Sequence, residues 1–307
     1  MTLTELRYIV AVADKRHFGQ AAEACHVSQP TLSVAVKRLE EDLGVILFER
    51  SRSEISLTPV GERVVEQAKK ALAESAAVRE VACASRDQLN DPLRLGAIYT
   101  IGPYLLPQLI PRVHERAPKM QLLISENYTH ELRPRLRNNE LDAILVALPF
   151  DEPGIETLPL YHEPFNILLP TSHPLSQREV IAPGDLEQET VLLLGPGHCF
   201  RDQVLEACPG CAQESGGQPG LQRSLEGASL ETIRMMVSSG VGTTVLPCSA
   251  AVASQNDSLV TLRPFTAPVP GRDVALAWRK SFPRPKAIEA IAEAVRAVGM
   301  SCVMKFT

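Results

Sequence analysis

Three cysteines and a histidine lie close together between positions 198 and 211. His198 and Cys199 are adjacent, Cys208 follows nine residues later, and Cys211 completes a Cys-Pro-Gly-Cys sequence. Cysteine thiolates attack peroxides, exchange disulfides and bind zinc. This segment is therefore the first candidate for chemistry in the 307-residue chain.

The residues around Cys199 predict a strand, a glycine-flanked turn and then a helix. The apolar run Val191–Leu194 predicts the strand, and Phe200 and Val204 fall on one face of a helix that begins at Cys199. The positive end of a helix dipole favours a thiolate at that position. Nine helical residues separate Cys199 from Cys208 by about 13 Å, whereas bridged Cα atoms lie within roughly 4.4 to 6.8 Å. A bond between the two sulfurs would require the helix to unwind or bend, as a switch does.

The residue pattern alone leaves several interpretations of this cluster open. Cys199 can be a buried small hydrophobe, the usual role of a free cysteine. His198 with the three thiols is a weak zinc pattern. Cys208-Pro-Gly-Cys211 can be a dithiol of the thioredoxin type, although the strand–helix context of that motif is absent.

Composition suggests that the chain stays in the cytoplasm. No apolar run approaches the roughly 20 residues that span a bilayer, and the N-terminus lacks a basic leader before an apolar block. The seven cysteines are an odd number, and a reducing compartment disfavours a disulfide framework. We therefore expect any pairing to be confined to the 199–211 cluster. The remaining cysteines are expected to be structural or incidental: Cys25, Cys83, Cys248 and Cys302.

The first 58 or so residues predict short helices that suit DNA reading. Ser28 is a good N-cap, Pro30 falls in the first helical turn, and we expect four residues to face inward: Leu32, Ala35, Val36 and Leu39. A helix-turn-helix places the start of its second helix in the major groove, and helix N-termini attract phosphate. The alternative is a three-helix packing module without DNA binding.

Polar residues occupy the outer face of the predicted recognition helix. Gln29 can pair with adenine, while Thr31 and Ser33 can meet bases or phosphates. The net charge of −5 does not favour nucleic acid by itself, so any DNA contact must come from local side chains. The candidate phosphate contacts are Lys37, Arg38, Arg50 and Arg52.

A small two-stranded wing over 50–58 and a long helix from Pro59 to about Asp87 follow. A weak heptad-like seam runs along that helix through Val64, Ala68, Ala71, Ser75, Val78 and Ala82. We expect the helix to join two domains and pair with its copy, since nothing adjacent offers it a core. The alternative is a helix that packs on its own domain.

Strands and helices alternate from Leu93 onward. Strand candidates are 93–98, 121–125, 143–148, 165–169, 191–194, 243–246 and 274–278; helix candidates include 102–115, 130–137, 230–239 and 286–298. This alternation predicts largely parallel α/β sheets, in two lobes with a cleft between them.

An ordered set of motifs in the N-terminal region resembles LysR-type transcription regulators. It comprises Phe18-Gly-Gln-Ala-Ala-Glu, Val27-Ser-Gln-Pro-Thr-Leu-Ser33, Leu47-Phe-Glu-Arg50 and Thr58-Pro-Val-Gly61. The resemblance implies an all-α winged helix-turn-helix and a linker helix, then a two-lobed α/β regulatory domain like that of periplasmic binding proteins. It also implies a homodimer or homotetramer, which suits paired DNA half-sites.

The regulatory region resembles the peroxide-sensing members of this family. The shared segments are Ala97-Ile-Tyr-Thr-Ile-Gly-Pro-Tyr104, Tyr128-Thr-His130, Gly197-His-Cys-Phe-Arg-Asp-Gln203 and Ser229–Val237. The resemblance implies a peroxidatic Cys199 and a resolving Cys208, with Thr100, Thr129 and His198 lining a peroxide pocket and Arg272 as a nearby cation. Cys211 departs from the family pattern, so this third thiol puts the resolving role of Cys208 in doubt.

We therefore predict three parts: a DNA-binding domain over 1–58, including Ser28 and Pro30 at its DNA face; a linker and dimerisation helix over 59–90; and a regulatory domain over 91–307. Its lobe I covers about 91–162 and 265–307, and lobe II about 163–264.

The predicted function is a transcription activator that senses hydrogen peroxide through a Cys199–Cys208 disulfide. Its partners are promoter DNA and RNA polymerase; we expect no membrane contact, metal, cofactor or enzymatic turnover. The rivals are a regulator with a small-molecule effector in the cleft, a thiol peroxidase with a DNA module, and a zinc-dependent regulator.

Overall fold

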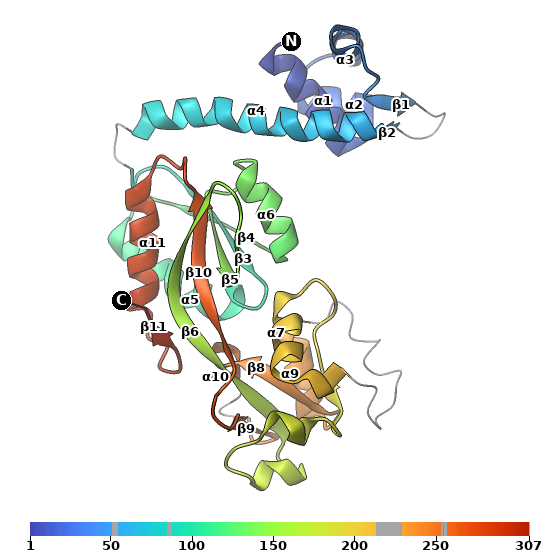
Figure 1. The fold of residues 1–307 in the computed structure, drawn as a ribbon. Helices are drawn as coiled ribbons and strands as arrows, with labels where there is room; N and C mark the ends of the chain where they lie inside the picture. The colour runs from blue at the N-terminus through green and yellow to red at the C-terminus, as the bar shows by residue number, and fades with distance from the viewer. Residues whose placement is uncertain (51–54, 85–87, 213–228, 253, 255–256, 307) are drawn as a thin grey trace. The chain divides into compact units, whose positions relative to one another are not determined.

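The computed structural model describes residues 1–50, 55–84, 88–212, 229–252, 254 and 257–306. The chain divides into two compact units, Met1–Arg86 and Asp87–Thr307, which are described separately (Figure 1).

The N-terminal unit is a set of helices with a two-stranded hairpin. Its elements are α1 (Leu3–Lys15), α2 (Phe18–Ala24), α3 (Gln29–Leu43), β1 (Phe48–Arg50), β2 (Ile55–Leu57) and α4 (Pro59–Ala84). Leu32, Val36 and Leu39 are buried in its core, as the spacing predicts, whereas Ala35 is only half-buried. Ser28 Oγ caps α3 by accepting from the Thr31 N–H, and Gly44 ends the helix with a left-handed φ of 68°. The predicted wing is confirmed for both strands; its tip, with Arg52, lies outside the described residues.

Helix α4 is long, as predicted, but its first half packs on its own domain. Val65 and Ala68 are buried against the core that α1 provides, and Val64 and Ala71 are half-buried there. The expectation that nothing adjacent offers the helix a core is therefore wrong for this half. Farther along, Val78 is 71% exposed.

The C-terminal unit is built on one curled mixed sheet. Its strands are β3 (Leu93–Ile98), β4 (Leu122–Asn127), β5 (Ala143–Ala147), β6 (Ile155–Pro170), β7 (Val191–Leu192), β8 (Thr243–Pro247), β9 (Val260–Pro264), β10 (Gly271–Arg279) and β11 (Met304–Lys305). The main order is β4-β3-β5-β10-β6-β8-β7, with β9 and β11 also pairing with β6. Parallel pairs are confined to the two ends, and β10 and β6 are antiparallel to their neighbours. The prediction of largely parallel sheets is thus wrong at the centre, where long strands rather than crossover helices connect the lobes.

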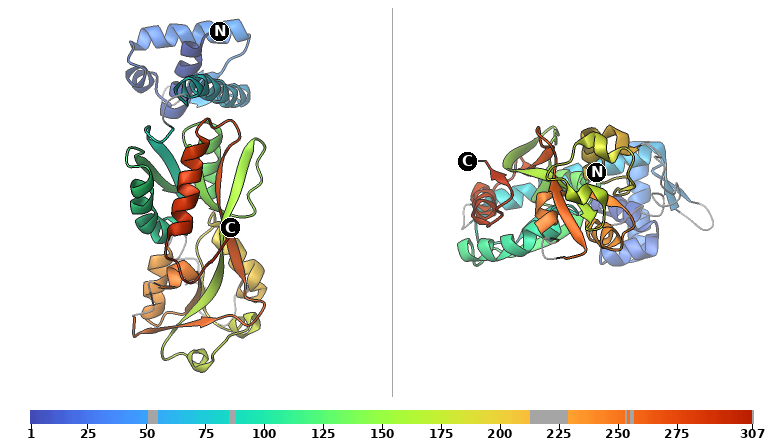
Figure 2. Two further views of the ribbon diagram at one scale, coloured as in Figure 1. Left: turned by 90° about the vertical axis from the view of Figure 1, so that its left-hand side faces the viewer. Right: turned by 90° about the horizontal axis from the view of Figure 1, so that it is seen from below.

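Helices cover the sheet at each end. They are α5 (Gly102–Arg116), α6 (Thr129–Arg137), α7 (Cys199–Ala207), α9 (Leu230–Ser238), α10 (Cys248–Val252) and α11 (Pro285–Ala297), with short 3-10 turns at Pro174–Gln177, Pro183–Leu186 and Pro209–Ala212. α5 and α11 pack together over lobe I (Figure 2). None of the helices that the structure describes is both long and apolar enough to cross a membrane.

Two separate buried clusters define the two lobes. β6 contributes Leu160 and Tyr161 to the lobe I core and Phe165 to the lobe II core. β10 pairs with β6 over most of its length. The two lobes are therefore joined by a pair of antiparallel strands, which together with the N-terminal unit confirms the predicted fold class.

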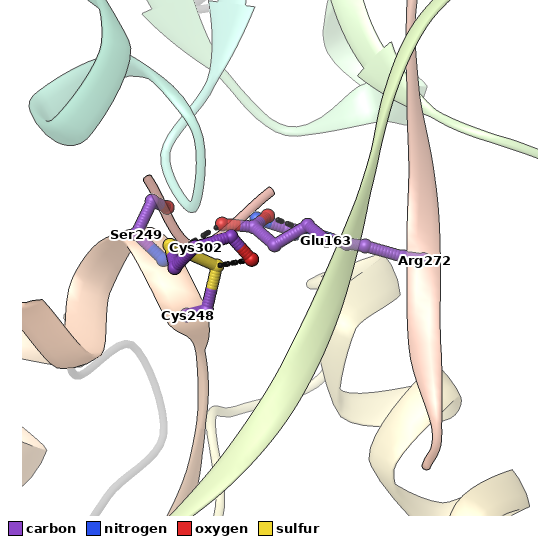
Figure 3. The surroundings of a disulfide bond; sticks show 5 residues. All are labelled: Glu163, Cys248, Ser249, Arg272 and Cys302. Carbon is purple, nitrogen blue, oxygen red and sulfur yellow. Dashed lines mark hydrogen bonds and ion pairs between the residues drawn. A yellow bond between two sulfur atoms is a disulfide. The ribbon is translucent and has the colours of Figure 1, made fainter. Parts of the chain in front are cut away.

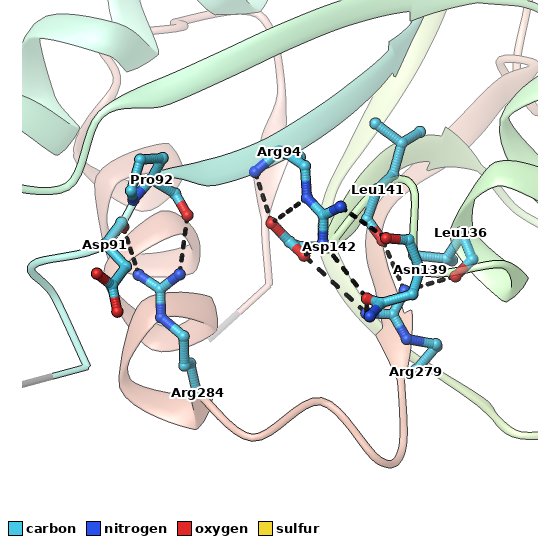
Figure 4. A network of polar contacts seen from close by, with 9 residues as sticks. All are labelled: Asp91, Pro92, Arg94, Leu136, Asn139, Leu141, Asp142, Arg279 and Arg284. Atoms are coloured by element: carbon cyan, nitrogen blue, oxygen red, sulfur yellow. Dashed lines mark hydrogen bonds and ion pairs between the residues drawn. The ribbon is translucent and has the colours of Figure 1, made fainter. Parts of the chain in front are cut away.

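A network of arginines fixes one end of lobe I (Figure 4). Arg94 binds the Asp142 carboxylate at 2.6 Å, and Arg279 donates to the Leu141 carbonyl at 2.6 Å. Arg284 donates to the carbonyls of Asp91 and Pro92 at 2.7 and 2.9 Å. Arg279 and Arg284 thereby satisfy backbone carbonyls in the segments that precede β5 and β3.

One disulfide in the structure contradicts the expectation for the cysteines. Cys248 and Cys302 are bonded; their Cα atoms lie 6.0 Å apart, and the two residues are 54 positions apart in sequence. The expectation that any pairing would be confined to the 199–211 cluster is therefore wrong. The chain after α11 returns along β6 and so brings Cys302 to the start of α10; no local sequence pattern reveals this approach.

Candidate functional site

Cys199 is the first residue of α7, as predicted. The preceding strand is shorter than expected and ends at Leu192, after which the chain turns through Gly197. Gly197 has a φ of +94°, a left-handed conformation that glycine adopts at little cost. A Cβ there would also lie 3.3 Å from the His130 ring. The turn therefore requires glycine, and it sets the point at which α7 begins.

A small cavity faces Cys199. Its lining residues are Ile98, Tyr99, Thr100, Asn127, Tyr128, Thr129, Gly197, His198 and Cys199. The cavity offers about 10 Å³ to the centre of a water-sized molecule, which is room for roughly one small molecule. The structure thus brings together four residues that the sequence singled out from three distant segments: Thr100, Thr129, His198 and Cys199.

Both threonines are positioned by the ends of neighbouring strands. Thr129 begins α6 just after β4, and its hydroxyl donates to Cys199 Sγ at 3.7 Å. Thr100 follows β3, and its Oγ1 accepts from the Arg272 guanidinium at 2.8 Å. Because β3 and β4 are parallel, their carboxyl ends lie at the same edge of the sheet. That edge is where the sequence placed these side chains.

Aromatic rings form a wall beside the sulfur. The His198 ring lies edge-on to Tyr128 at 4.7 Å, and Tyr128 stacks on His130 at 5.3 Å. Tyr99 meets Tyr128 edge-on at 5.3 Å. Burial lowers the pKa of His198, so its ring is neutral at neutral pH. Tyr99 and Tyr128 were not among the residues predicted for the site, although each directly precedes one of the two threonines.

Arg272 lies behind Thr100 and does not line the cavity. Its Nη2 donates to the Thr100 carbonyl at 2.8 Å, and its Nε pairs with Glu163 at 2.8 Å, with both side chains fully buried. The guanidinium also lies over the Phe200 ring, 5.2 Å from its centroid. A buried cation of this kind is compensated by its carboxylate. Arg272 therefore contacts the residue that follows Cys199, and its influence on the thiolate stays a prediction.

Cys208 and Cys211 lie together in the lobe II core. Both are free and almost fully buried, and their thiols share a hydrogen bond. That bond and burial together raise the pKa of Cys208, which keeps this thiol protonated. Cys208 directly follows the last residue of the intact α7, so the helix separates it from Cys199 as predicted. Among the described residues, no group of three or more His, Cys, Asp or Glu side chains is arranged to hold a metal ion.

The start of α3 presents the predicted DNA-reading residues on the surface. Gln29, Pro30 and Thr31 are exposed, as are Lys37 and Arg38, while Ser33 is half-buried. Lys37 lies 3.7 Å from Glu41, an exposed pair that contributes little to stability. Arg50 is the last residue of β1, and its side chain lies outside the described residues.

Two family models match the chain. The bacterial regulatory helix-turn-helix protein model of the lysR family matches residues 3–62, and the LysR substrate binding domain matches 86–299. The DNA-binding transcriptional dual regulator OxyR of Escherichia coli K12 is 37% identical over 297 residues, covering 97% of this chain and 95% of that protein. The chain belongs to the LysR family and, within it, to the OxyR group.

Solved structures of this group resemble the chain over its full length. A full-length OxyR variant from Pseudomonas aeruginosa is 54% identical, with a TM-score of 0.80, covering 100% of this chain and 99% of that one. An H2O2-bound OxyR mutant from Corynebacterium glutamicum is 32% identical, with a TM-score of 0.62, covering 97% of this chain and 92% of that one.

Proposed function

We propose that this chain is a DNA-binding transcription regulator that senses hydrogen peroxide through Cys199. The observation that carries the proposal is the position of the Cys199 sulfur. It stands at the N-terminus of α7, accepts a hydroxyl bond from Thr129, and borders a cavity with room for about one small molecule. A thiolate in this setting can react with a molecule as small as hydrogen peroxide.

In the first chemical step, the Cys199 thiolate attacks one oxygen of hydrogen peroxide. The O–O bond breaks, Cys199 becomes a sulfenic acid, and the second oxygen leaves as hydroxide that takes up a proton to form water. Thr129 already donates its one hydroxyl hydrogen to Cys199 Sγ, whereas Thr100 can donate a hydrogen bond to a peroxide oxygen. Thr100 is well placed because its Oγ1 accepts from Arg272, which leaves its own hydroxyl hydrogen to donate. The neutral His198 ring closes the cavity without supplying a competing charge.

In the second step, the Cys208 thiol attacks the Cys199 sulfur and water leaves, which forms the disulfide. Since α7 separates the two residues by about 13 Å, the bond cannot form until the helix unwinds. Phe200 and Val204 on this helix are buried in the lobe II core, so unwinding must repack that core. We propose that this repacking alters the assembly of copies and thereby the spacing of the recognition helices on DNA.

The proposed partners follow from this role. Double-stranded operator DNA would meet the start of α3, where Ser28, Gln29, Pro30, Thr31 and Ser33 gather, with Lys37, Arg38 and Arg50 contacting phosphates. A homodimer or homotetramer would match paired half-sites, and RNA polymerase would receive the signal. Such a protein works in the cytoplasm beside the bacterial DNA and reacts once per oxidation rather than turning over. We propose that residues 1–58 bind DNA, residues 59–90 form the linker and dimerisation helix, and residues 91–307 form the regulatory domain.

Thiol mapping tests the proposal. Reduced protein is exposed to one equivalent of hydrogen peroxide, quenched by alkylation and analysed by peptide mass spectrometry. We expect a Cys199–Cys208 link within seconds, and a trapped Cys199 sulfenic acid in Cys208→Ser. Cys199→Ser should retain DNA binding and lose the response. A reduced Cys199 in the treated protein would contradict peroxide sensing, and a link from Cys199 to Cys211 would reassign the resolving thiol.

A larger cavity supports a second candidate function, the binding of a small-molecule effector. It has a volume of about 760 Å³ and is lined by α7, β6, β10 and the end of β5, including Gln203, Glu206, His162, Asp273 and Leu148. The buried Gln203 Oε1 has no hydrogen-bond partner there. A metabolite that raises the unfolding temperature equally in the parent and Cys199→Ser would favour this function; stabilisation by none of a panel of metabolites would oppose it.

A further inference from the structure

The Cys248–Cys302 disulfide joins the two lobes of the regulatory unit. Cys248 begins α10, whose Ala250 and Ala251 are buried in the lobe II core. Cys302 lies between Met300 and Val303, which pack in or against the lobe I core. The bond therefore links the lobes at a point separate from the β6 and β10 strands that connect them (Figure 3).

A buried chain of polar contacts leads from this disulfide to the Cys199 cavity. The backbone N–H of Ser249, next to Cys248, donates to Glu163 Oε1 at 3.0 Å, and Glu163 Oε2 pairs with Arg272 at 2.8 Å. Arg272 in turn donates to Oγ1 and to the carbonyl of Thr100, both at 2.8 Å. Figure 3 shows Ser249, Glu163 and Arg272 in line beside the sulfur atoms.

A movement of one member of this chain of contacts must be followed by the others. Glu163 is fully buried, and Arg272 and Thr100 are 3% and 2% exposed, so water does not replace a lost partner. Separating one partner of a buried charged pair is costly because the other charge is left unpaired. A displacement of Cys248 and Ser249 would therefore move Glu163, and with it the arginine that fixes Thr100 at the cavity wall.

The C-terminal segment is held by this bond, by the packing of Met300 and Val303 on the lobe I core, and by a short strand pairing. Only two residues of β11 pair with β6, Met304 with His162 and Lys305 with Tyr161. The Phe306 N–H adds one bond to the Leu160 carbonyl, and Lys305 Nζ donates to two carbonyls at the end of α11. Short exposed pairings of this kind are among the first parts of a structure to open. Breaking the disulfide would leave few contacts to keep the segment after α11 against lobe II.

We propose that Cys248 and Cys302 are a second redox couple, whose disulfide holds the lobes together and keeps Thr100 in place for the reaction at Cys199. Disulfides are uncommon in reducing compartments, and those that occur there are usually redox-sensing. The redox property stands on the geometry of this pair alone, whereas its effect on Cys199 rests on the proposed peroxide function.

The chemistry of the couple is thiol–disulfide exchange with a dithiol reductant. One reductant thiolate attacks Cys302 Sγ, which is the more exposed sulfur, and Cys248 leaves as a thiolate that takes up a proton. The second reductant thiol then attacks the mixed disulfide and releases Cys302. The products are two cysteine thiols and one oxidised dithiol, and an oxidised dithiol drives the reverse reaction.

The first test is a redox titration of the full-length chain in buffers of reduced and oxidised dithiothreitol. The thiols are alkylated and counted by peptide mass spectrometry, with Cys25 as the internal reference. We expect Cys248 and Cys302 to lose reactivity together in a single two-electron transition. The proposal is overturned if both stay free in the most oxidising buffer, or if the bond survives the most reducing one.

The second test measures the rate of Cys199 oxidation by peroxide in a Cys248→Ala/Cys302→Ala variant, with Cys25→Ala as the matched control. We expect oxidation at least about fivefold slower in the double variant and unchanged in the control. Glu163→Gln removes the negative charge that pairs with Arg272 and leaves the disulfide unchanged. This variant should slow the oxidation of Cys199 to a similar extent. Hydrogen exchange along β6 and β10 verifies that each variant is folded.

The outcomes separate the two proposals. Equal rates in the double variant and its control overturn the coupling to Cys199. If Cys199 does not react in any variant, including the parent, the peroxide function fails, and the titration still decides whether the couple is redox-active.

Discussion

At the scale of single residues, Cys199 differs from the other described cysteines in what surrounds its sulfur. It is half-exposed beside a small cavity, whereas Cys208 and Cys211 are buried in an apolar core and Cys248 is bonded to Cys302. Its sulfur accepts the hydroxyl hydrogen of Thr129, and its backbone begins α7. The surroundings of the sulfur, rather than the residue type, therefore single out Cys199 as the proposed peroxide-reactive residue.

Removal of the Thr129 hydroxyl should slow the reaction with peroxide. Thr129→Val keeps the shape of the side chain and loses the bond to Cys199 Sγ. A hydrogen bond to a charged group contributes roughly 1.5 to 3 kcal/mol, so we expect oxidation roughly tenfold to hundredfold slower. Stopped-flow kinetics of thiol loss would measure this, with Thr261→Val on β9 as the control. An unchanged rate would show that the Thr129 hydroxyl plays no part.

The burial of His198 predicts a pH dependence of stability. Burial lowers the pKa of His198 below its ordinary 6.5, so the unfolded chain binds the proton more readily than the folded one. The stabilisation is then complete above pH 6.5 and is lost as the pH falls through the lower, folded pKa. Urea unfolding from pH 7.5 to 5 should show this loss in the parent and a flatter profile in His198→Gln. If the stability of the parent and of His198→Gln fell equally with pH, the pH dependence would not arise from His198.

At the scale of elements, α7 is both the support of Cys199 and the obstacle to its disulfide. The helix begins after the left-handed Gly197 and ends at Cys208, while Phe200 and Val204 anchor it in lobe II. An element that must unwind to react has to be only moderately stable, and nine residues is short for a helix. The same helix also lines the larger cavity through Gln203 and Glu206, so an effector there would bear on the same switch.

A side chain at position 197 should destabilise the start of this helix. Gly197→Ala imposes a left-handed conformation on a residue with a Cβ, which costs roughly 1 to 2 kcal/mol. We expect the free energy of unfolding to fall by about that amount in urea titrations. Gly184→Ala is the matched control, since its Cβ would meet nothing within 4 Å and its φ is not left-handed. If Gly197→Ala lowered the free energy of unfolding no more than Gly184→Ala does, the turn would tolerate a Cβ at position 197.

At the scale of the whole molecule, the chain carries a net charge of −5 and still presents a polar, partly basic face on α3. DNA recognition must therefore arise from a few placed side chains and from the end of a helix rather than from overall charge. Two copies of such a face would be needed to read two half-sites.

Two substitutions on α3 should separate base reading from phosphate binding. Gln29→Ala should relax preference at one base pair and cost roughly 1 to 3 kcal/mol on the best operator. Lys37→Ala should weaken binding about equally on all sequences and lower the salt dependence by about one charge. Fluorescence anisotropy at several salt concentrations distinguishes the two effects. Identical behaviour of the two variants would mean that α3 does not read bases.

The start points of two helices at functional positions were predictable from the sequence. The N-cap Ser28 marks the start of α3, and the glycine-flanked turn before Cys199 marks the start of α7, because both signals act within a few residues. Thr100 and Thr129 could be placed at one sheet edge because parallel strands bring their carboxyl ends together. The N-terminal motifs indicated the family, and the motifs around Cys199 indicated its peroxide-sensing members.

Which distant residues meet could be learned only from the folded chain. It packs α4 on its own domain, places the buried Glu163–Arg272 pair behind Thr100, and closes a bond between Cys248 and Cys302 across 54 residues. The long antiparallel strands at the centre of the sheet were likewise invisible in the order of helices and strands. Contacts of this kind depend on where the whole chain folds back on itself, so the residues next to each partner in sequence do not predict them.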